Sequence, residues 1–246
     1  MREPDAIFAD PHQAELYDVF DGGRGDLDAY VALVDELGAR RVIDVGCGTG
    51  CLAVRLAEAG LDVVGVDPAE ASVDVARAKS YADRVTWVDG DATALVGRVT
   101  DADLAVMTGN VAQVFVTDDD WLATLRAVRS CLRTGGWFVF ETRRAEVRDW
   151  ETWTRPPTPV TLPDGRTAVQ SCTVTDVALP LVTFEGWTRI DGQVLHSTST
   201  LRFRSQEEVT AGLDRCGFEV VEVRDAPDRP GKEMVFLARV RESVGD

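Results

Sequence analysis

The chain has 246 residues, 45% hydrophobic and 28% charged, which suits a globular protein with one substantial core and a modest appendage. Its 42 acidic residues outnumber 26 basic ones, so the formal net charge is -16, and no run of Lys and Arg is present. Because nucleic-acid-binding proteins carry a basic surface, this balance disfavours a DNA or RNA partner. The sequence has no apolar stretch of the roughly 20 residues that a membrane helix needs, and no signal-peptide pattern. We therefore expect a cytoplasmic protein with no membrane partner.

The cysteines show no spacing typical of metal sites. Their number is odd, and nothing in their positions suggests a disulfide framework, which fits a reducing cytoplasm. We expect no metal site. The five cysteines are Cys47, Cys51, Cys131, Cys172 and Cys216.

Hydrophobic periodicity predicts alternating helices and strands through the first 141 residues. Helices are expected at 10–20, 26–37, 51–60, 70–80 and 121–133, and strands at 42–45, 61–66, 84–88, 103–107 and 137–141. Such alternation predicts a mostly parallel sheet with helices on both faces.

A glycine-rich turn, Gly46-Cys47-Gly48-Thr49-Gly50, joins the first strand to the next helix. Glycine has no Cβ, so the backbone can turn sharply there and approach a ligand closely. The dinucleotide fingerprint is G-x-G-x-x-G, but its sixth position here is Cys51. The G-x-G-x-G spacing instead resembles motif I of the class I S-adenosylmethionine (SAM) methyltransferases. A dinucleotide site, or a tight turn that binds nothing, are the alternatives at this point.

Two acids follow later strands at the positions that the resemblance requires. Asp67 ends the second strand, one βαβ unit after the turn, where such folds bind ribose hydroxyls. Because Asp67-Pro68 is also a good helix start, Asp67 could serve only as an N-cap. Gly90-Asp91-Ala92 resembles the adenine site of the family, with Asp91 accepting from the exocyclic amino group, although Asp89-Gly90 could be a simple turn.

The resemblance implies SAM as cofactor, S-adenosylhomocysteine (SAH) as product, and two N-terminal helices that close over the cofactor. The metal-dependent catechol subclass would carry a carboxylate where this chain has Thr108. The cluster 118–120 fits the acidic first turn of a helix better than a metal site. The expected cofactor-binding residues are Asp44, Gly46, Cys47, Gly48, Gly50, Asp67, Pro68, Asp91, Ala92 and Thr108.

The loop 108–113 lies where methyl group and acceptor should meet, so the expected substrate residues are Asn110, Gln113, Arg143 and Trp187. The run 14–20 resembles the N-terminus of bacterial N-methyltransferases that modify amino sugars on nucleotide carriers. In those enzymes a tyrosine of this helix reaches cofactor or substrate, which makes Tyr17 a catalytic candidate, or else a packed helix residue. Those enzymes carry a histidine where this chain has Gln113, which can hydrogen-bond but cannot act as a base.

A change of composition after the fifth strand indicates an insertion at 151–204. Strands are expected at 167–178, 181–189 and 193–203, with a hairpin turn at Asp191-Gly192. Pairing across this turn places Trp187 opposite His196 and gives the hairpin one apolar and one polar face. His196 is the second catalytic candidate, or else a solvated sheet histidine. We expect the insertion to cap the pocket or to form a dimer contact.

The nucleotide-fold pattern resumes with a helix at 205–216 and strands at 218–224 and 234–240, matching the sixth and antiparallel seventh strands of the family. The expected fold is α/β: a Rossmann-like seven-stranded class I methyltransferase sheet, built from 1–150 and 205–246, with an antiparallel β insertion. The expected activity is SAM-dependent methyl transfer to an O or N atom of a small metabolite, by in-line displacement driven mainly by positioning. The alternatives are a nicotinamide-dependent oxidoreductase or a SAM-binding protein without methyl transfer. The expected partner is a small-molecule acceptor, and the protein is a monomer or a homodimer.

Overall fold

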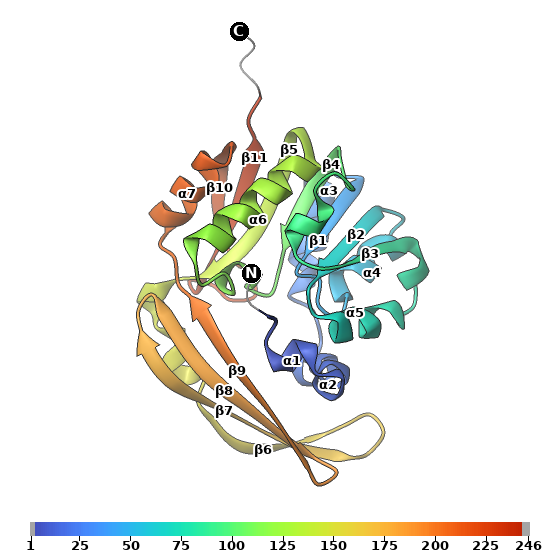
Figure 1. Ribbon diagram of the computed structural model, residues 1–246, viewed down its shortest axis with the longest axis vertical. Coiled ribbons are helices and arrows are strands. Elements are labelled where there is room, and N and C mark those ends of the chain that lie inside the picture. Colours follow the sequence, from blue (N-terminus) through green and yellow to red (C-terminus); the bar gives the residue numbers. More distant parts are fainter. Residues whose placement is uncertain (1–2, 243–246) are drawn as a thin grey trace.

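Two sheets form the framework of the protein, which a computed structural model describes over residues 3–242 (Figure 1). The larger sheet has the strand order β10-β11-β5-β4-β1-β2-β3. Strands β3, β2, β1, β4 and β5 are parallel, whereas β11 runs antiparallel to both of its neighbours. This order confirms the expected seven-stranded methyltransferase sheet. Its strands are β1 Arg41–Val45, β2 Asp62–Asp67, β3 Val85–Asp89, β4 Ala102–Met107, β5 Leu132–Arg143, β10 Phe218–Asp225 and β11 Glu233–Val240.

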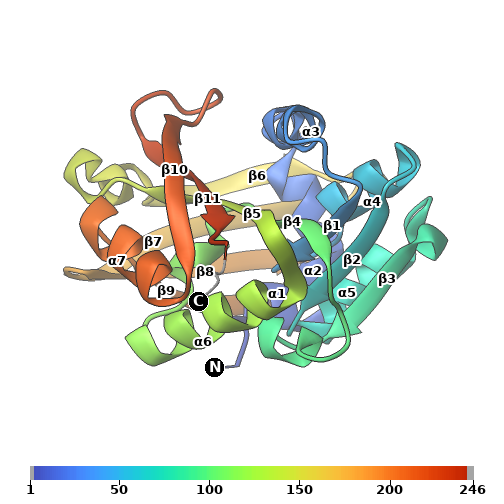
Figure 2. The same ribbon diagram turned by 90° about the horizontal axis from the view of Figure 1, so that it is seen from above.

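Helices cover both faces of this sheet, as Figure 2 shows. Helices α3 and α4 pack on one face through an apolar cluster, and α6 and α7 pack on the other through a second cluster. Because both faces are covered, the central strands are apolar along their length, as parallel strands generally are. The helices are α1 Ala6–Ala9, α2 Pro11–Asp21, α3 Leu27–Glu36, α4 Cys51–Glu58, α5 Glu70–Arg77, α6 Asp118–Cys131 and α7 Gln206–Arg215. Short 3₁₀ turns lie at Ala82–Arg84, Ala92–Leu95, Val111–Gln113, Ala145–Val147 and Asp149–Thr152.

Side-chain caps fix where two helices begin. The Thr117 hydroxyl accepts from the Asp120 amide, and the three acids of the first turn of α6 face the positive end of the helix dipole. Ser205 and Glu208 form a reciprocal capping box at the start of α7. Helix α6 ends two residues earlier than expected, because β5 already begins at Leu132.

The insertion folds as a separate antiparallel sheet in the order β6-β7-β8-β9. The register across the hairpin pairs Trp187 with His196, as expected. Strand β6 was not expected because three prolines interrupt it, but β6 is an edge strand, where a residue without an N–H is tolerated. The four strands are β6 Arg155–Thr161, β7 Thr167–Ala178, β8 Leu181–Ile190 and β9 Gln193–Arg202.

The N-terminal helices join the two sheets. Leu16 of α2 packs in a cluster with Leu162 and Ile190 of the insertion. The Ile7 amide of α1 donates to Ser197 Oγ over 3.0 Å, and Phe8 O in the same helix accepts from the Ser72 hydroxyl of α5 over 2.8 Å. Helix α1 was not expected, since four residues are too few for a helical period. The expectation that the helices at 10–20 and 26–37 both close over the cofactor is corrected in part, because the second of them, α3, packs on α4 instead.

Candidate active site

A cavity of about 450 Å³ lies between the carboxyl ends of β1, β2 and β4 and the inner face of the insertion sheet. The glycine turn and Asp67 form its floor, Phe8 and Tyr17 of the N-terminal helices form one wall, and Phe184 and Leu201 form its roof. Open α/β sheets bind their ligands at this edge.

The three glycines of the turn adopt left-handed backbone conformations for different reasons. A Cβ on Gly46, at φ +72°, would lie 2.6 Å from Val111 Cγ1. Gly46 therefore lets the loop 108–113, named the acceptor loop for its expected role, approach the turn. A Cβ on Gly48 would meet nothing within 4 Å. Gly50 lines no part of the cavity; a Cβ there would lie 2.6 Å from the Trp87 ring. Gly50 therefore shapes the turn from outside the cavity.

Asp67 lies at the cavity edge with both carboxylate oxygens partly engaged. Oδ2 accepts from the Gly48 amide and Oδ1 from the Ala69 amide, each over 2.8 Å. Burial raises the pKa of Asp67, while these two bonds oppose the rise. Since a carboxylate has about four lone-pair positions, one on each oxygen remains for a ligand. Asp67 thus both holds the start of the following helix and faces the cavity.

Asp44 is a buried carboxylate that lacks a full set of partners. Its side chain is 1% exposed, and within residues 3–242 its Oδ1 has no hydrogen-bond partner. Burial, together with the charge of Asp67, raises the pKa of Asp44 to about 7, and Arg24 opposes the rise. Burying an unpaired carboxylate is costly. A ligand with a cationic N–H group would therefore complete this site.

Arg24 is a cavity residue that sequence reasoning missed. It follows α2, and two hydrogen bonds of 3.1 Å from its guanidinium to Asp26 hold it in place. The sequence feature that could have indicated Arg24 is the glycine-rich segment 22–25, which bends the chain back towards the glycine turn. A guanidinium here can bind a carboxylate of the same ligand that satisfies Asp44.

The remaining expected cofactor residues Cys47, Pro68, Asp91, Ala92 and Thr108 all line the cavity. Asp91 caps the turn Ala92–Leu95, because its Oδ1 accepts from the Thr93 amide over 2.8 Å. Its second oxygen takes no hydrogen bond from the described part of the chain.

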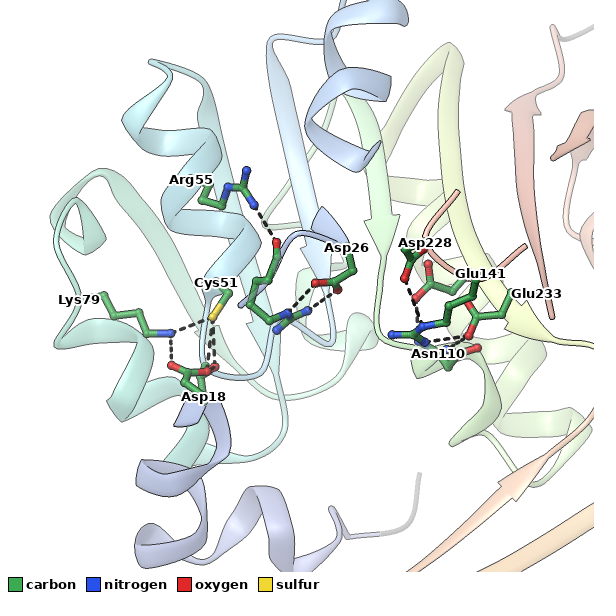
Figure 3. A network of polar contacts seen from close by, with 12 residues as sticks. Asp18, Asp26, Cys51, Arg55, Lys79, Asn110, Glu141, Asp228 and Glu233 are labelled. Carbon is green, nitrogen blue, oxygen red and sulfur yellow. Dashed lines mark hydrogen bonds and ion pairs between the residues drawn. The ribbon is translucent and has the colours of Figure 1, made fainter. Parts of the chain in front are cut away.

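A buried acidic pair fixes the acceptor loop (Figure 3). The Asn110 amide donates to Glu141 Oε1 over 3.1 Å, and Asn110 Nδ2 donates to Glu233 Oε1 over 2.9 Å. Arg229 supports Glu233 from the other side at 2.8 Å. Burial and the charge of Glu233 raise the pKa of Glu141 to about 7. The loop that carries Thr108 and Asn110 is thus held by its backbone as well as its side chains.

Gln113 and Arg143 act as one unit. Gln113 is fully buried and does not line the cavity, but its Oε1 accepts from Arg143 Nη1 over 2.9 Å. Arg143 does line the cavity, with its guanidinium carbon 5.1 Å from the centre of the Trp153 ring. Gln113 can therefore reach a ligand only through Arg143.

Trp187 and His196 lie outside the cavity. Their rings stack with centroids 3.9 Å apart, and Glu185 lies 3.5 Å from His196. Side chains alternate along a strand, so the face that presents Phe184 and Leu201 to the cavity directs Trp187 and His196 away from it. Of the two catalytic candidates, only Tyr17 lines the cavity, where its ring lies 5.3 Å from that of Phe8.

Asp18 connects the wall of the cavity to its floor (Figure 3). Asp18 of α2 pairs with Lys79 Nζ at 2.5 Å and accepts a hydrogen bond from the Thr49 hydroxyl of the glycine turn. Burial alone would raise the pKa of Asp18, but Lys79 and Thr49 hold it below its usual value. The hydrogen bond from Thr49 ties the helix that carries Tyr17 to the turn, and the ion pair ties the same helix to the segment after α5.

Two further observations concern metals and membranes. In the part of the chain that the structure describes, no three His, Cys, Asp or Glu side chains gather into a group that could hold a metal ion. Among the helices at 3–242, none has the length and hydrophobicity to cross a bilayer.

Comparison with known proteins agrees with this geometry. The fold is similar to that of SAM-dependent methyltransferases of known structure. Residues 42–136, which carry the glycine turn, Asp67 and Asp91, match the family model of the methyltransferase domain.

Curated relatives align with less than half of the chain. A cypemycin N-terminal methyltransferase from a Streptomyces species is 36% identical over 110 residues, 45% of this chain and 44% of that protein. A ubiquinone biosynthesis O-methyltransferase from Bordetella avium is 34% identical over 116 residues, 45% of each chain. This chain spans less than half the length of these relatives.

Solved structures extend the similarity of fold to the whole chain. A SAM-dependent methyltransferase from Clostridium acetobutylicum is 16% identical with a TM-score of 0.73, covering 94% of this chain and 97% of that one. The sugar N-methyltransferase KedS8 from a Streptoalloteichus species is 22% identical with a TM-score of 0.72, covering 92% and 93%. The insertion sheet is therefore part of a shared architecture.

Proposed function

We propose that the protein transfers a methyl group from SAM to an oxygen or nitrogen atom of a small metabolite. The observation that carries the proposal is the pair Asp44 and Asp67 beside the glycine turn: a buried carboxylate whose Oδ1 has no partner, and a second one with free lone pairs. These groups suit a ligand that carries an ammonium and a ribose. SAM, when bound, supplies a methyl group on a sulfonium and leaves as SAH.

Each polar residue of the floor has a distinct proposed role in holding SAM. Asp44 accepts from the ammonium, Arg24 binds the carboxylate, Asp67 accepts from the ribose hydroxyls, and Asp91 accepts from the adenine amino group. The residues that complete the floor and walls are Gly46, Cys47, Gly48, Pro68, Ala92 and Thr108. Gly50 supports the turn from outside.

On the acceptor side, the proposed residues are Tyr17, Asn110 and Arg143, with Gln113 positioning Arg143. Holding acceptor and donor in line can supply about 7–11 kcal/mol, so positioning is the main contribution. A base adds roughly 10²–10⁴-fold only when the acceptor must lose a proton, and Tyr17 is the candidate that faces the cavity. We assign no role to His196 or Trp187, because both lie outside the cavity.

The same proposal covers the organisation and setting of the protein. Residues 1–150 and 205–246 form the SAM-binding core and 151–204 the cap; residues 1–2 and 243–246 of these ranges lie outside the described residues. We propose a cytoplasmic location, supported by the five free cysteines, and a monomer or homodimer. The excess of acidic residues supports a small-molecule partner over a nucleic acid.

Binding and turnover test the proposal separately. Calorimetry with SAM, SAH and NAD should show binding of the first two only; binding of NAD without SAM would favour the oxidoreductase alternative, which the methyltransferase match already disfavours. SAH release should then be measured against a panel of small alcohols, phenols and amines. Tight SAM binding with no SAH formed against any acceptor class would favour a SAM-binding protein without methyl transfer.

A further inference from the structure

The acceptor end of the cavity carries two arginines from different parts of the fold. We define this acceptor chamber by Arg143, at the end of β5, and by Arg155, Phe184, Ser199 and Leu201 of the insertion sheet. The floor described above supplies none of these residues.

Arg143 is held in place by Gln113 and Glu233 and keeps hydrogen-bond donors for a ligand. Its Nη1 donates to Gln113 over 2.9 Å, its Nε lies 3.8 Å from Glu233 Oε1, and its guanidinium lies over the Trp153 ring. Glu233 is bound more closely by Arg229, at 2.8 Å. Burial lowers the pKa of Arg143, but a guanidinium stays protonated in proteins. Its Nη2 donates to no residue between 3 and 242, which leaves a fixed cation at the cavity wall.

The roof adds two more donors. Arg155 lines the cavity, and its side chain forms no ion pair or hydrogen bond with any residue that the structure describes. Ser199, only 6% exposed, lines the same cavity, and its hydroxyl takes part in no hydrogen bond within the described ranges. A hydroxyl at the cavity surface can donate to a polar ligand.

Acidic side chains also line the cavity. The carboxylates of the floor, Asp44 and Asp67, serve the donor end; Glu3 and Asp5 line the cavity from the N-terminal segment. Within residues 3–242 neither Glu3 nor Asp5 forms an ion pair with Arg143 or Arg155. In a chain with 42 acidic and 26 basic residues, this leaves Arg155 and the Nη2 group of Arg143 available to an outside anion, although Glu233 lies near Arg143.

Phe184 and Leu201 give the chamber an apolar surface. The Phe184 ring meets Trp153 edge-on with centroids 5.3 Å apart, and Trp153 also contacts Arg143. The apolar surface and the fixed cation are therefore neighbours, joined through one tryptophan.

We propose that the methyl acceptor is a small organic anion, with a carboxylate or phosphate group and an apolar body. Arg143 donates to the anionic oxygens, Arg155 and Ser199 add donors from the roof, and Phe184 and Leu201 contact the apolar body. The proposal rests on the proposed function, since it names the substrate class for the same cavity.

Binding of simple anions to the SAH complex tests the proposal without turnover. Benzoate and inorganic phosphate are titrated separately at constant ionic strength, with calorimetry and tryptophan fluorescence as readouts, because Trp153 lies against Arg143. We expect at least one of them to bind, and Arg143→Gln to weaken binding about 10- to 100-fold, since a hydrogen bond to a charged group contributes about 1.5–3 kcal/mol. Binding of benzoate alone identifies a carboxylate acceptor, and of phosphate alone a phosphorylated one.

Two further variants keep the test decisive. Arg155→Gln changes an exposed side chain without described partners, so it should fold and weaken anion binding several-fold. Arg148→Gln is the matched control, because Arg148 is an exposed arginine of the same region that lies outside the cavity and pairs with Glu151. Absence of anion binding, or equal binding by wild type and both cavity variants, would overturn the proposal. SAM binding by the same samples separates this outcome from failure of the proposed function.

Discussion

Replacing Asp67 with alanine should separate its structural role from its proposed role in SAM binding. The carboxylate accepts from Gly48 and Ala69, and keeps one free position on each oxygen. Removing the two backbone bonds should lower the unfolding free energy by about 1–3 kcal/mol, which lowers Tm by a few degrees or more in a chain of this size. Removing a hydrogen bond to a ribose hydroxyl should weaken SAM binding about 10- to 100-fold, since 1.4 kcal/mol corresponds to tenfold.

The assay is calorimetry with SAH alongside thermal unfolding of the ligand-free protein. Asp62→Ala is the control: Asp62 begins the same strand at its far end and makes only an exposed 3.3 Å pair with Arg41, which contributes less than about 1 kcal/mol. It should leave SAH affinity unchanged. If Asp67→Ala lowers Tm but binds SAH within twofold of wild type, Asp67 is purely structural and the ribose assignment fails.

Three other predictions concern the floor of the cavity and the acceptor loop. Asp44, with a pKa of about 7, must be ionised to pair with an ammonium, so SAH affinity should fall up to tenfold per pH unit below pH 7. Asp44→Asn should flatten this dependence, and a constant affinity of the wild type from pH 7.5 to 5.5 would contradict the pairing. Gly46→Ala should lower Tm more than Gly38→Ala, because both glycines have positive φ but only the Gly46 Cβ meets Val111; equal decreases would show that the loop yields freely. The pKa of Glu141 is about 7 in the folded protein and near 4.5 in the unfolded chain, so the folded state loses stability as pH rises between these two values. Glu141→Gln should therefore raise Tm at pH 8 and not at pH 5, and an increase independent of pH would refute this.

The sequence predicted most of the larger sheet well because most of its signals are local. The glycine turn and the acid one βαβ unit later depend on residues close in the chain, whereas the antiparallel last strand was expected from the family resemblance; all appear where expected. Strand β6 escaped prediction because proline reads as a strand breaker unless the strand is known to lie at an edge. Helix α1 was too short to show a period.

The acceptor side was harder to predict because it depends on docking between distant segments. Hairpin register correctly grouped Trp187 with His196, but register alone does not say which face of a sheet meets the cavity. That choice follows from how Leu16 and the roof pack together, an interaction between residues far apart in the chain. Arg24 and Arg155 were missed for the same reason, since each reaches the cavity only after folding.

The division of the cavity between two sheets has a consequence for how such a protein can diversify. The floor belongs to the seven-stranded sheet, whereas Arg155, Phe184, Ser199 and Leu201 all come from one continuous segment between β5 and α7. Substitutions or grafts within that segment can change the proposed acceptor site while leaving in place the residues proposed to hold SAM. Arg143 is the exception, because it belongs to β5. Any roof that replaces the present one would therefore still face the positive charge of Arg143.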